Sequence, residues 1–267
     1  MSYQQKASRV NPCLIVFLLD DSGSMADTLT GTNDTRFKWV ELYFGHILFE
    51  LLKRSTEMAG DAQRIKPRYY VYVVMYGSSL RIWGSGLMDI ETAVKLFSDT
   101  GQGLGLGGYL GGTDAEMGFS AIEPILQQAI TDPKFAQSFP PMVFHLTDGE
   151  SSTDAGPIAE RIRQLSTGDG QALVLNAYIG TQTELNYQGP EDFPGYKSPV
   201  DVGSSHDNLR LFEMSSVIPD TIQQNLIAEG VFPSLQPSAR LFFDVRTKDM
   251  LKNVIQVVGS LGSRAAR

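Results

Sequence analysis

Three oxygen-bearing side chains alternate in a polar loop that directly follows a run of apolar residues. The apolar run covers residues 14–19, and the sequence Asp-Asp-Ser-Gly-Ser follows over residues 20–24. Because Asp20, Ser22 and Ser24 alternate, one carboxylate and two hydroxyls can converge on a single point. These hard oxygen donors carry one formal charge between them, which suits a divalent cation such as Mg²⁺ that keeps several of its waters.

Two later segments offer donors of the same kind. Thr113 follows a glycine-rich stretch, and Asp148 closes a second apolar run that starts at Met142. A continuous apolar run is typical of a parallel strand buried on both faces, and ligands of open α/β sheets bind at the carboxyl ends of such strands. Two aspartates facing one another there would repel unless a cation lay between them, which is a physical reason to expect a metal.

The three segments together resemble the metal-ion-dependent adhesion site (MIDAS) of von Willebrand factor A (vWA) domains. In that family an Asp-x-Ser-x-Ser motif closes the first strand, a Thr comes from a later glycine-rich loop, and an Asp ends a later strand. The resemblance extends over roughly residues 13–262, because the order of the expected elements agrees too. Carried over residue by residue, it implies that the metal ligands are Asp20, Ser22, Ser24, Thr113 and Asp148, the last directly or through water.

The resemblance implies a protein-binding module rather than an enzyme. The expected ion is Mg²⁺, with Mn²⁺ or Ca²⁺ as substitutes, and its open coordination position would accept an Asp or Glu carboxylate from a protein partner. The chain is most similar in kind to the stand-alone intracellular vWA proteins of bacteria, such as those of the tellurite-resistance type. Such proteins work with AAA+ ATPases, metal chelatases, or kinases and phosphatases of the same operon, so a cytoplasmic protein is expected.

Apolar and aromatic periodicities predict a doubly wound, mainly parallel α/β sheet with one short antiparallel edge strand and helices on both faces. The domain is expected to span residues 13–262, between an N-terminal tail (1–12) and a C-terminal tail (263–267). Strands are predicted over residues 14–19, 68–76, 80–83, 142–146, 172–179 and 240–245, helices over 37–58, 90–97, 114–130, 154–165, 207–214, 219–228 and 248–261, and a long loop over 181–205.

Composition disfavours some classes of partner, metal site and targeting segment. The net charge is -8 and no run of Lys or Arg occurs, which disfavours nucleic acid as a partner. Cys13 is the only cysteine, which excludes an intramolecular disulfide and a cysteine-based zinc site. Residues 1–12 are polar and the apolar run after them is short, so no membrane span or secretory signal is expected.

Four features have competing interpretations. The polar cluster 20–24 can also be a capping network, since Asp and Ser favour turns. Asp21 is expected to point away from Asp20, either as a neighbour of the site or toward solvent. Residues 103–108 match G-x-G-x-x-G, but no strand precedes them and no helix follows, so the glycines are interpreted as allowing movement or a close approach to the metal. His145 is interpreted as a hydrogen-bonded core histidine.

Two other functions stay open. A Mg²⁺-dependent phosphohydrolase with an aspartyl nucleophile at Asp20 would use a similar acidic loop, but Ser22 stands where that class usually carries a second Asp as general acid. A scaffold that has lost its metal site would keep the fold without binding a divalent ion.

Overall fold

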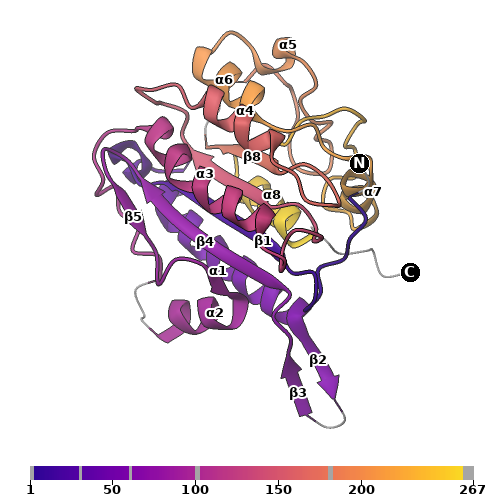
Figure 1. Cartoon of the computed structure of the whole chain (residues 1–267). Coiled ribbons are helices and arrows are strands. Elements are labelled where there is room, and N and C mark those ends of the chain that lie inside the picture. Colours follow the sequence, from indigo (N-terminus) through magenta and orange to yellow (C-terminus); the bar gives the residue numbers. More distant parts are fainter. Residues whose placement is uncertain (1–2, 30–31, 60–61, 100–102, 180–182, 261–267) are drawn as a thin grey trace.

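A seven-stranded sheet runs through the centre of the molecule, and helices pack on both of its faces (Figure 1). The computed structural model describes residues 3–29, 32–59, 62–99, 103–179 and 183–260. The strand order is β5-β4-β1-β7-β8-β9, and the short β6 also pairs with β4. The parallel strands are β1 (Cys13–Asp20), β4 (Tyr69–Tyr76), β7 (Met142–Thr147), β8 (Leu173–Tyr178) and β9 (Phe242–Asp244); β5 (Leu80–Ile82) and β6 (Met88–Asp89) run antiparallel to β4.

The central strand β1 is buried on both faces, as its continuous apolar run predicts. Ile15 and Phe17 lie in one apolar layer, whereas Val16 and Leu18 lie in the layer on the opposite face. Alternating side chains point to opposite faces of a strand, so two separate layers of helices are needed to cover them. This arrangement confirms the predicted doubly wound, mainly parallel α/β fold.

Helices cover both faces, with their apolar stripes turned inward. Helix α1 buries Val40, Phe44, Leu48 and Leu51, which recur at helical spacing. Helices α1 (Arg36–Ser55), α2 (Ile90–Asp99) and α8 (Lys248–Ser260) pack on one face, α3 (Ala115–Thr131) and α4 (Gly156–Gln164) pack on the other, and α5 (Pro199–Val202), α6 (His206–Met214) and α7 (Asp220–Ala228) follow β8.

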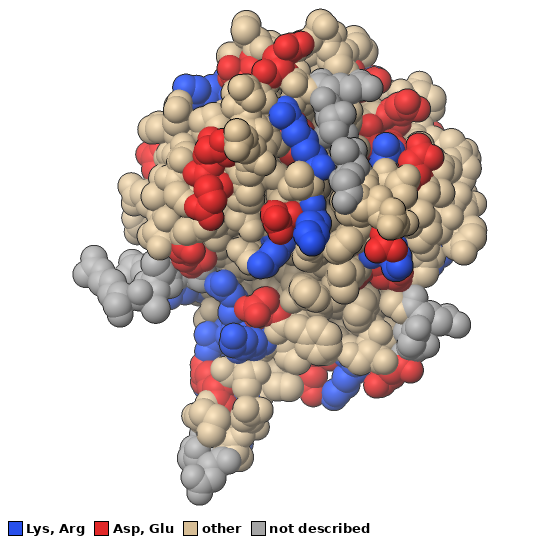
Figure 2. Space-filling view, turned by 180° about the vertical axis from the view of Figure 1, so that it is seen from behind, with Lys and Arg blue, Asp and Glu red and all other residues tan. Residues whose placement is uncertain are grey.

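A hairpin that the periodicity did not predict projects from one end of the molecule (Figures 1 and 2). The helix expected to reach Met58 ends at Ser55, and β2 (Thr56–Ala59) and β3 (Ala62–Ile65) pair antiparallel as a separate two-stranded sheet. Thr56 is β-branched and has extended backbone angles. Met58 is 67% exposed, so no core contact continues the helix there.

Residues 3–7 of the predicted N-terminal tail lie against the body of the protein. The backbone N–H groups of Gln4 and Gln5 donate to the Asp169 carboxylate at 2.9 and 3.1 Å, and Ala7 is buried. The predicted C-terminal tail over 263–267 lies outside the described residues. Within the described ranges, no helix is long and apolar enough to cross a membrane.

The sheet changes its direction of winding at β1. Strand β4 lies on one side of β1 and β7 on the other, so the carboxyl ends of β1 and β7 meet at the switch point where open α/β sheets bind ligands. Leu19 pairs with Leu146, which brings Asp20 beside Thr147 and close to Asp148. The topology therefore gathers the predicted carboxylates at one edge of the sheet.

Candidate metal-binding site

Asp20 is the last residue of β1, and its carboxylate is fully buried. Its Oδ1 accepts a hydrogen bond from the backbone N–H of Ser22 (2.9 Å), and its Oδ2 accepts one from the Thr147 hydroxyl (2.7 Å). Burial raises the pKa of Asp20 to about 6, with a further contribution from the charge of Asp148 and against the two hydrogen-bonding partners, which lower it. The carboxylate is therefore fixed in position and poorly compensated, and a nearby cation would stabilise its charged form.

Ser22 and Ser24 present their hydroxyls side by side. Ser22 precedes the short helix η1 (Gly23–Ala26), and Ser24 lies within it. The two Oγ atoms are 3.2 Å apart. Since the backbone of Ser22 is also bonded to Asp20, the turn holds one carboxylate and two hydroxyls in one small region.

Asp148 supplies a second carboxylate immediately after β7. Its side chain is 4% exposed, and its Oδ2 accepts a hydrogen bond from Nη1 of Arg36 at 2.8 Å. Its Oδ1 is buried and makes no hydrogen bond with any described residue. A buried, unpaired carboxylate oxygen is costly, so a cation at Oδ1 would stabilise this arrangement.

Arg36, the first residue of α1, is a member of the site that the sequence pattern did not indicate. Besides Asp148, its Nη1 contacts the carbonyl oxygen of Ser24 at 3.3 Å. Its backbone N–H donates to the Asp27 carbonyl (2.9 Å), which closes the loop between η1 and α1. No motif marks this arginine, because only the return of that loop brings it to Asp148.

Thr113 is placed near the site by its backbone. The carbonyl of Gly111, two residues earlier, accepts a hydrogen bond from the N–H of Gly23 at 2.8 Å, so the loop that carries Thr113 contacts η1. The hydroxyl of half-buried Thr113 makes no hydrogen bond within the described part of the chain. Its role as a metal ligand therefore stays a prediction.

Asp21 is fully buried, so the solvent-facing alternative is wrong. Its Oδ1 accepts hydrogen bonds from the N–H groups of Gly107 and Gly108, both at 2.8 Å, and its Oδ2 lies 3.4 Å from Nη2 of Arg81. The Asp21 carboxylate is thus hydrogen-bonded to the glycine-rich loop that leads to Thr113.

The glycine-rich loop is held from two further sides. Arg81 of β5 donates to the carbonyls of Leu104 (3.0 Å) and Gly105 (2.8 Å), and Oε1 of Glu41 accepts hydrogen bonds from the N–H groups of the same two residues at 2.6 and 2.8 Å. At Gly108, φ is +71° and an added Cβ would lie 3.0 Å from the Ser22 carbonyl oxygen. Gly108 therefore permits a close approach of the loop to the backbone of Ser22, and the expected approach to the metal stays a prediction.

His145 is a buried, hydrogen-bonded core residue, as the sequence indicated. Its Nε2 lies 2.7 Å from the Tyr76 hydroxyl, and its Nδ1 lies 2.6 Å from Oδ1 of Asn176. The amide nitrogen of Asn176 donates to the Leu211 carbonyl (3.0 Å), so Oδ1 must accept from His145 and Nδ1 carries the proton. Burial lowers the pKa of His145 to about 4, so the imidazole is neutral.

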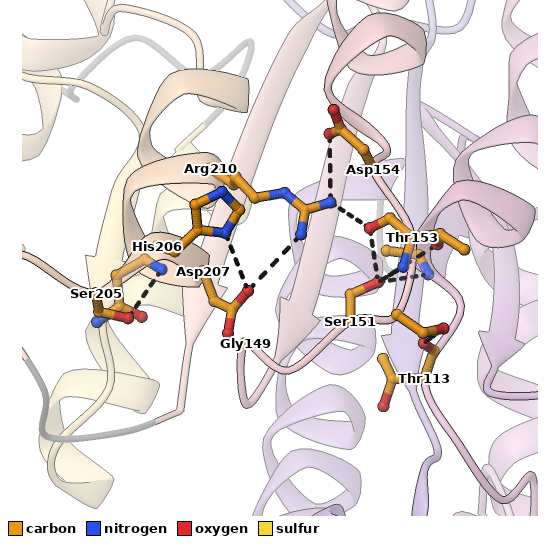
Figure 3. Close-up of polar contacts among 12 residues, drawn as sticks. Thr113, Gly149, Ser151, Thr153, Asp154, Ser205, His206, Asp207 and Arg210 are labelled. Carbon is orange, nitrogen blue, oxygen red and sulfur yellow. Dashed lines mark hydrogen bonds and ion pairs between the residues drawn. The ribbon is translucent and has the colours of Figure 1, made fainter.

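A polar rim ties the loop after β7 to two helices (Figure 3). Arg210 of α6 lies 3.4 Å from the Asp154 carboxylate and 3.7 Å from that of Asp207, and it donates to the Thr153 carbonyl. The Thr153 hydroxyl donates to Asp114 at 2.8 Å. Asp114 also caps α3, so the residue after Thr113 is fixed to the loop that follows Asp148.

The donor set fits a divalent cation. Two carboxylates and two hydroxyls lie at one edge of the sheet, and hard oxygen donors of low total charge suit Mg²⁺ or Mn²⁺. No group of three or more His, Cys, Asp or Glu residues able to hold a metal occurs within the described ranges. A metal here would therefore depend on hydroxyl ligands as well as carboxylates, which is the composition of the predicted site.

No family model and no curated protein matches this sequence. Among solved structures, the pilus adhesin SpaC from Lactobacillus rhamnosus GG is similar over 96% of this chain and 31% of its own, at 13% identity and a TM-score of 0.59. Proximal thread matrix protein 1 from the mussel byssus is similar over 96% of this chain and 49% of its own, at 14% identity and a TM-score of 0.51.

A structure of the same mussel protein with a zinc-occupied MIDAS motif is similar over 96% of this chain and 46% of that chain, at 12% identity and a TM-score of 0.51. This chain thus spans less than half the length of each of these proteins. At such identities the likeness shows the fold alone, and it confirms the vWA-type fold that the sequence resemblance implied.

Proposed function

We propose that this protein is a metal-dependent protein-binding module and not an enzyme. The unpaired, buried Oδ1 of Asp148 at the switch point of the sheet is the observation that supports it most strongly. The neighbouring Asp20 carboxylate and the Ser22 and Ser24 hydroxyls add donors of the same chemistry. A zinc-occupied MIDAS motif in one protein of the same fold supports the assignment by likeness.

The proposed ion is Mg²⁺, with Mn²⁺ or Ca²⁺ as substitutes. Bound there, the ion would supply a Lewis-acidic position that accepts a carboxylate from a partner. Asp20 and Asp148 would contribute the charge, while the neutral hydroxyls would orient the ion without cancelling its positive charge. The residues proposed to hold it are Asp20, Ser22, Ser24, Thr113 and Asp148.

The proposed partner is a protein that presents an exposed Asp or Glu side chain. The rim formed by Arg210, Asp207 and the loop 151–154 borders the site and would contact the residues around that side chain. An AAA+ ATPase, or a kinase or phosphatase of the same operon, is proposed from the family resemblance alone, and so is a cytoplasmic location.

Water relaxation by protein-bound Mn²⁺ tests this function. The wild type should enhance the relaxation rate of water protons, and acetate should lower that enhancement because its carboxylate replaces coordinated water. Acetamide, which has the same shape but no charge, should have little effect. Retained enhancement at saturating acetate would show that the bound ion does not accept a carboxylate, and the binding-module proposal would be wrong.

The ion pair between Arg36 and Asp148 favours one alternative, a scaffold whose site is closed without metal. Such a protein would bind neither Mn²⁺ nor Mg²⁺. The phosphohydrolase alternative is tested in the same preparation with a generic phosphoester. We expect no hydrolysis that depends on Asp20. Hydrolysis by the wild type that is lost in Asp20→Asn would favour the enzyme.

A further inference from the structure

Arg36 forms an ion pair with Asp148, whose carboxylate the proposed metal would also bind. Its guanidinium is hydrogen-bonded to Oδ2 of Asp148, and Asp148 has no other ion-pair partner among the residues described. We propose that Arg36 has two successive roles: it neutralises Asp148 in the metal-free protein, and it becomes a binding residue for the partner's carboxylate once a metal occupies the site. This inference rests on the proposed function.

The first role follows from charge. The neighbouring Asp21 is already compensated by Arg81 and two backbone N–H groups, so it does not compete for Arg36. A divalent cation at Asp148 and the guanidinium would repel each other at short range. Binding of the metal must therefore weaken the ion pair, and Arg36 must lower the affinity for the metal.

The second role follows from the donors that Arg36 leaves unused. Its Nε and Nη2 make no hydrogen bond with a described residue, and its side chain is 22% exposed. It lines a pocket of about 230 Å³ together with Ser24, Asp148, Tyr178 and Asn208. A planar guanidinium at the wall of such a pocket matches the geometry of a carboxylate.

The same pocket also limits which partner fits. Its lining includes the carboxylates of Asp27, Glu150 and Asp207, and of these three only Asp207 forms an ion pair with a described arginine or lysine, Arg210. A strongly acidic peptide would be repelled by these three carboxylates. The inferred ligand is therefore a single Asp or Glu flanked by neutral or basic residues.

One substitution should have opposite effects on the two ligands. Arg36→Gln should bind Mn²⁺ about three- to tenfold more tightly than the wild type, because the repulsion is removed. The Mn²⁺-loaded variant should bind acetate about three- to tenfold more weakly, because the guanidinium donors are lost. A substitution that merely loosened the site would weaken the binding of both Mn²⁺ and acetate. Tighter Mn²⁺ binding together with weaker acetate binding therefore identifies the proposed role of Arg36.

Two controls accompany the titrations. Arg36→Lys keeps the charge but loses the planar donors, so Mn²⁺ affinity should stay near that of the wild type while acetate binding weakens. Arg161→Gln removes an arginine that pairs with Glu123 on the surface and changes the net charge equally, and it should alter neither affinity.

The outcomes separate the inference from the proposed function. Mn²⁺ binding by Arg36→Gln that is unchanged or weaker overturns the first role, and unchanged acetate binding overturns the second. If Arg36→Gln does not fold, the acetate affinity of Arg36→Lys decides the second role, and its failure to weaken overturns the proposal. A wild type that binds no Mn²⁺ contradicts the proposed function instead.

Discussion

Thr147 and His145 connect the candidate site to the interior of the sheet. The Thr147 hydroxyl bonds Asp20, and Tyr76, which lies beside Thr147, donates to the neutral His145. His145 in turn donates to Asn176. The Asp20 carboxylate is therefore at one end of a series of buried polar groups. In this series Nε2 of His145 accepts a hydrogen bond, so a protonated imidazole would lack an acceptor for its second N–H.

His145 should make the fold sensitive to mild acid. Burial lowers its pKa to about 4 in the folded protein, against 6.5 as its ordinary value. As the pH falls through 6.5, the unfolded chain binds a proton that the folded protein does not, so stability is lost down to about pH 4.

Urea unfolding of the wild type and of His145→Gln, at pH 7 and at pH 5, measures this contribution. The wild type should lose about 2 kcal/mol more than the variant between the two pH values. The comparison with the variant removes the contribution of other groups, such as Asp20. Equal losses in both proteins would mean that His145 is not held neutral in the folded state.

Single residues also show what could be predicted from the sequence. The oxygen donors of residues 20–24 were recognisable because their types and alternation are local. Arg36 and Thr147 were not, because Arg36 reaches Asp148 only through the return of a loop and Thr147 reaches Asp20 only through the register of β1 with β7. Such partners depend on tertiary structure, which local spacing does not encode.

At the scale of elements, the glycine-rich loop is fixed by charged side chains from three separate segments. Asp21 follows β1, Arg81 belongs to β5 and Glu41 belongs to α1, and each binds backbone groups of the loop. The loop leads directly to Thr113. Its conformation, and with it the position of the threonine hydroxyl, therefore depends on these contacts.

Asp21→Asn should weaken Mn²⁺ binding by acting through Thr113. Loss of the charge weakens the contacts with the loop amides and Arg81, and we expect about a threefold to tenfold loss of affinity. In a double-mutant cycle, the same substitution in a Thr113→Ala background should have almost no further effect. An undiminished effect in that background would show that Asp21 acts by another route.

Elements were predicted well where their apolar side chains contact the core. The apolar runs of β1, β7 and β8 and the stripe of α1 follow from periodicity, because burial imposes it. The β2–β3 hairpin was missed because it projects from the body, so no core imposes a pattern on its sequence. The sequence therefore predicted correctly those elements that pack against the core.

At the scale of the whole molecule, the candidate site joins segments that are distant in the sequence. The end of β1, the start of α1, the loop before α3 and the residues after β7 all contribute to it. The donors of several of these segments come together only in the folded protein. An ion that they hold would therefore bind the folded state and not the unfolded chain. Metal binding should therefore stabilise the entire fold.

Thermal unfolding with and without Mg²⁺ measures this stabilisation. At a free concentration about 100-fold above the dissociation constant, the folded state should gain about 3 kcal/mol. For a domain of this size that raises the Tm by about 5–10 °C. Chelation with EDTA should reverse the rise, and an unchanged Tm under saturating metal would mean that the ion does not join these segments.

The most direct test of the central claim is a calorimetric titration of Mg²⁺ and Mn²⁺ into the wild type and into the double variant Asp20→Ala, Ser22→Ala. We predict saturable binding at a single site in the wild type and none in the variant, which should remain folded. Absence of binding in the wild type, or the same binding in both proteins, would contradict the assignment of a metal site to this edge of the sheet.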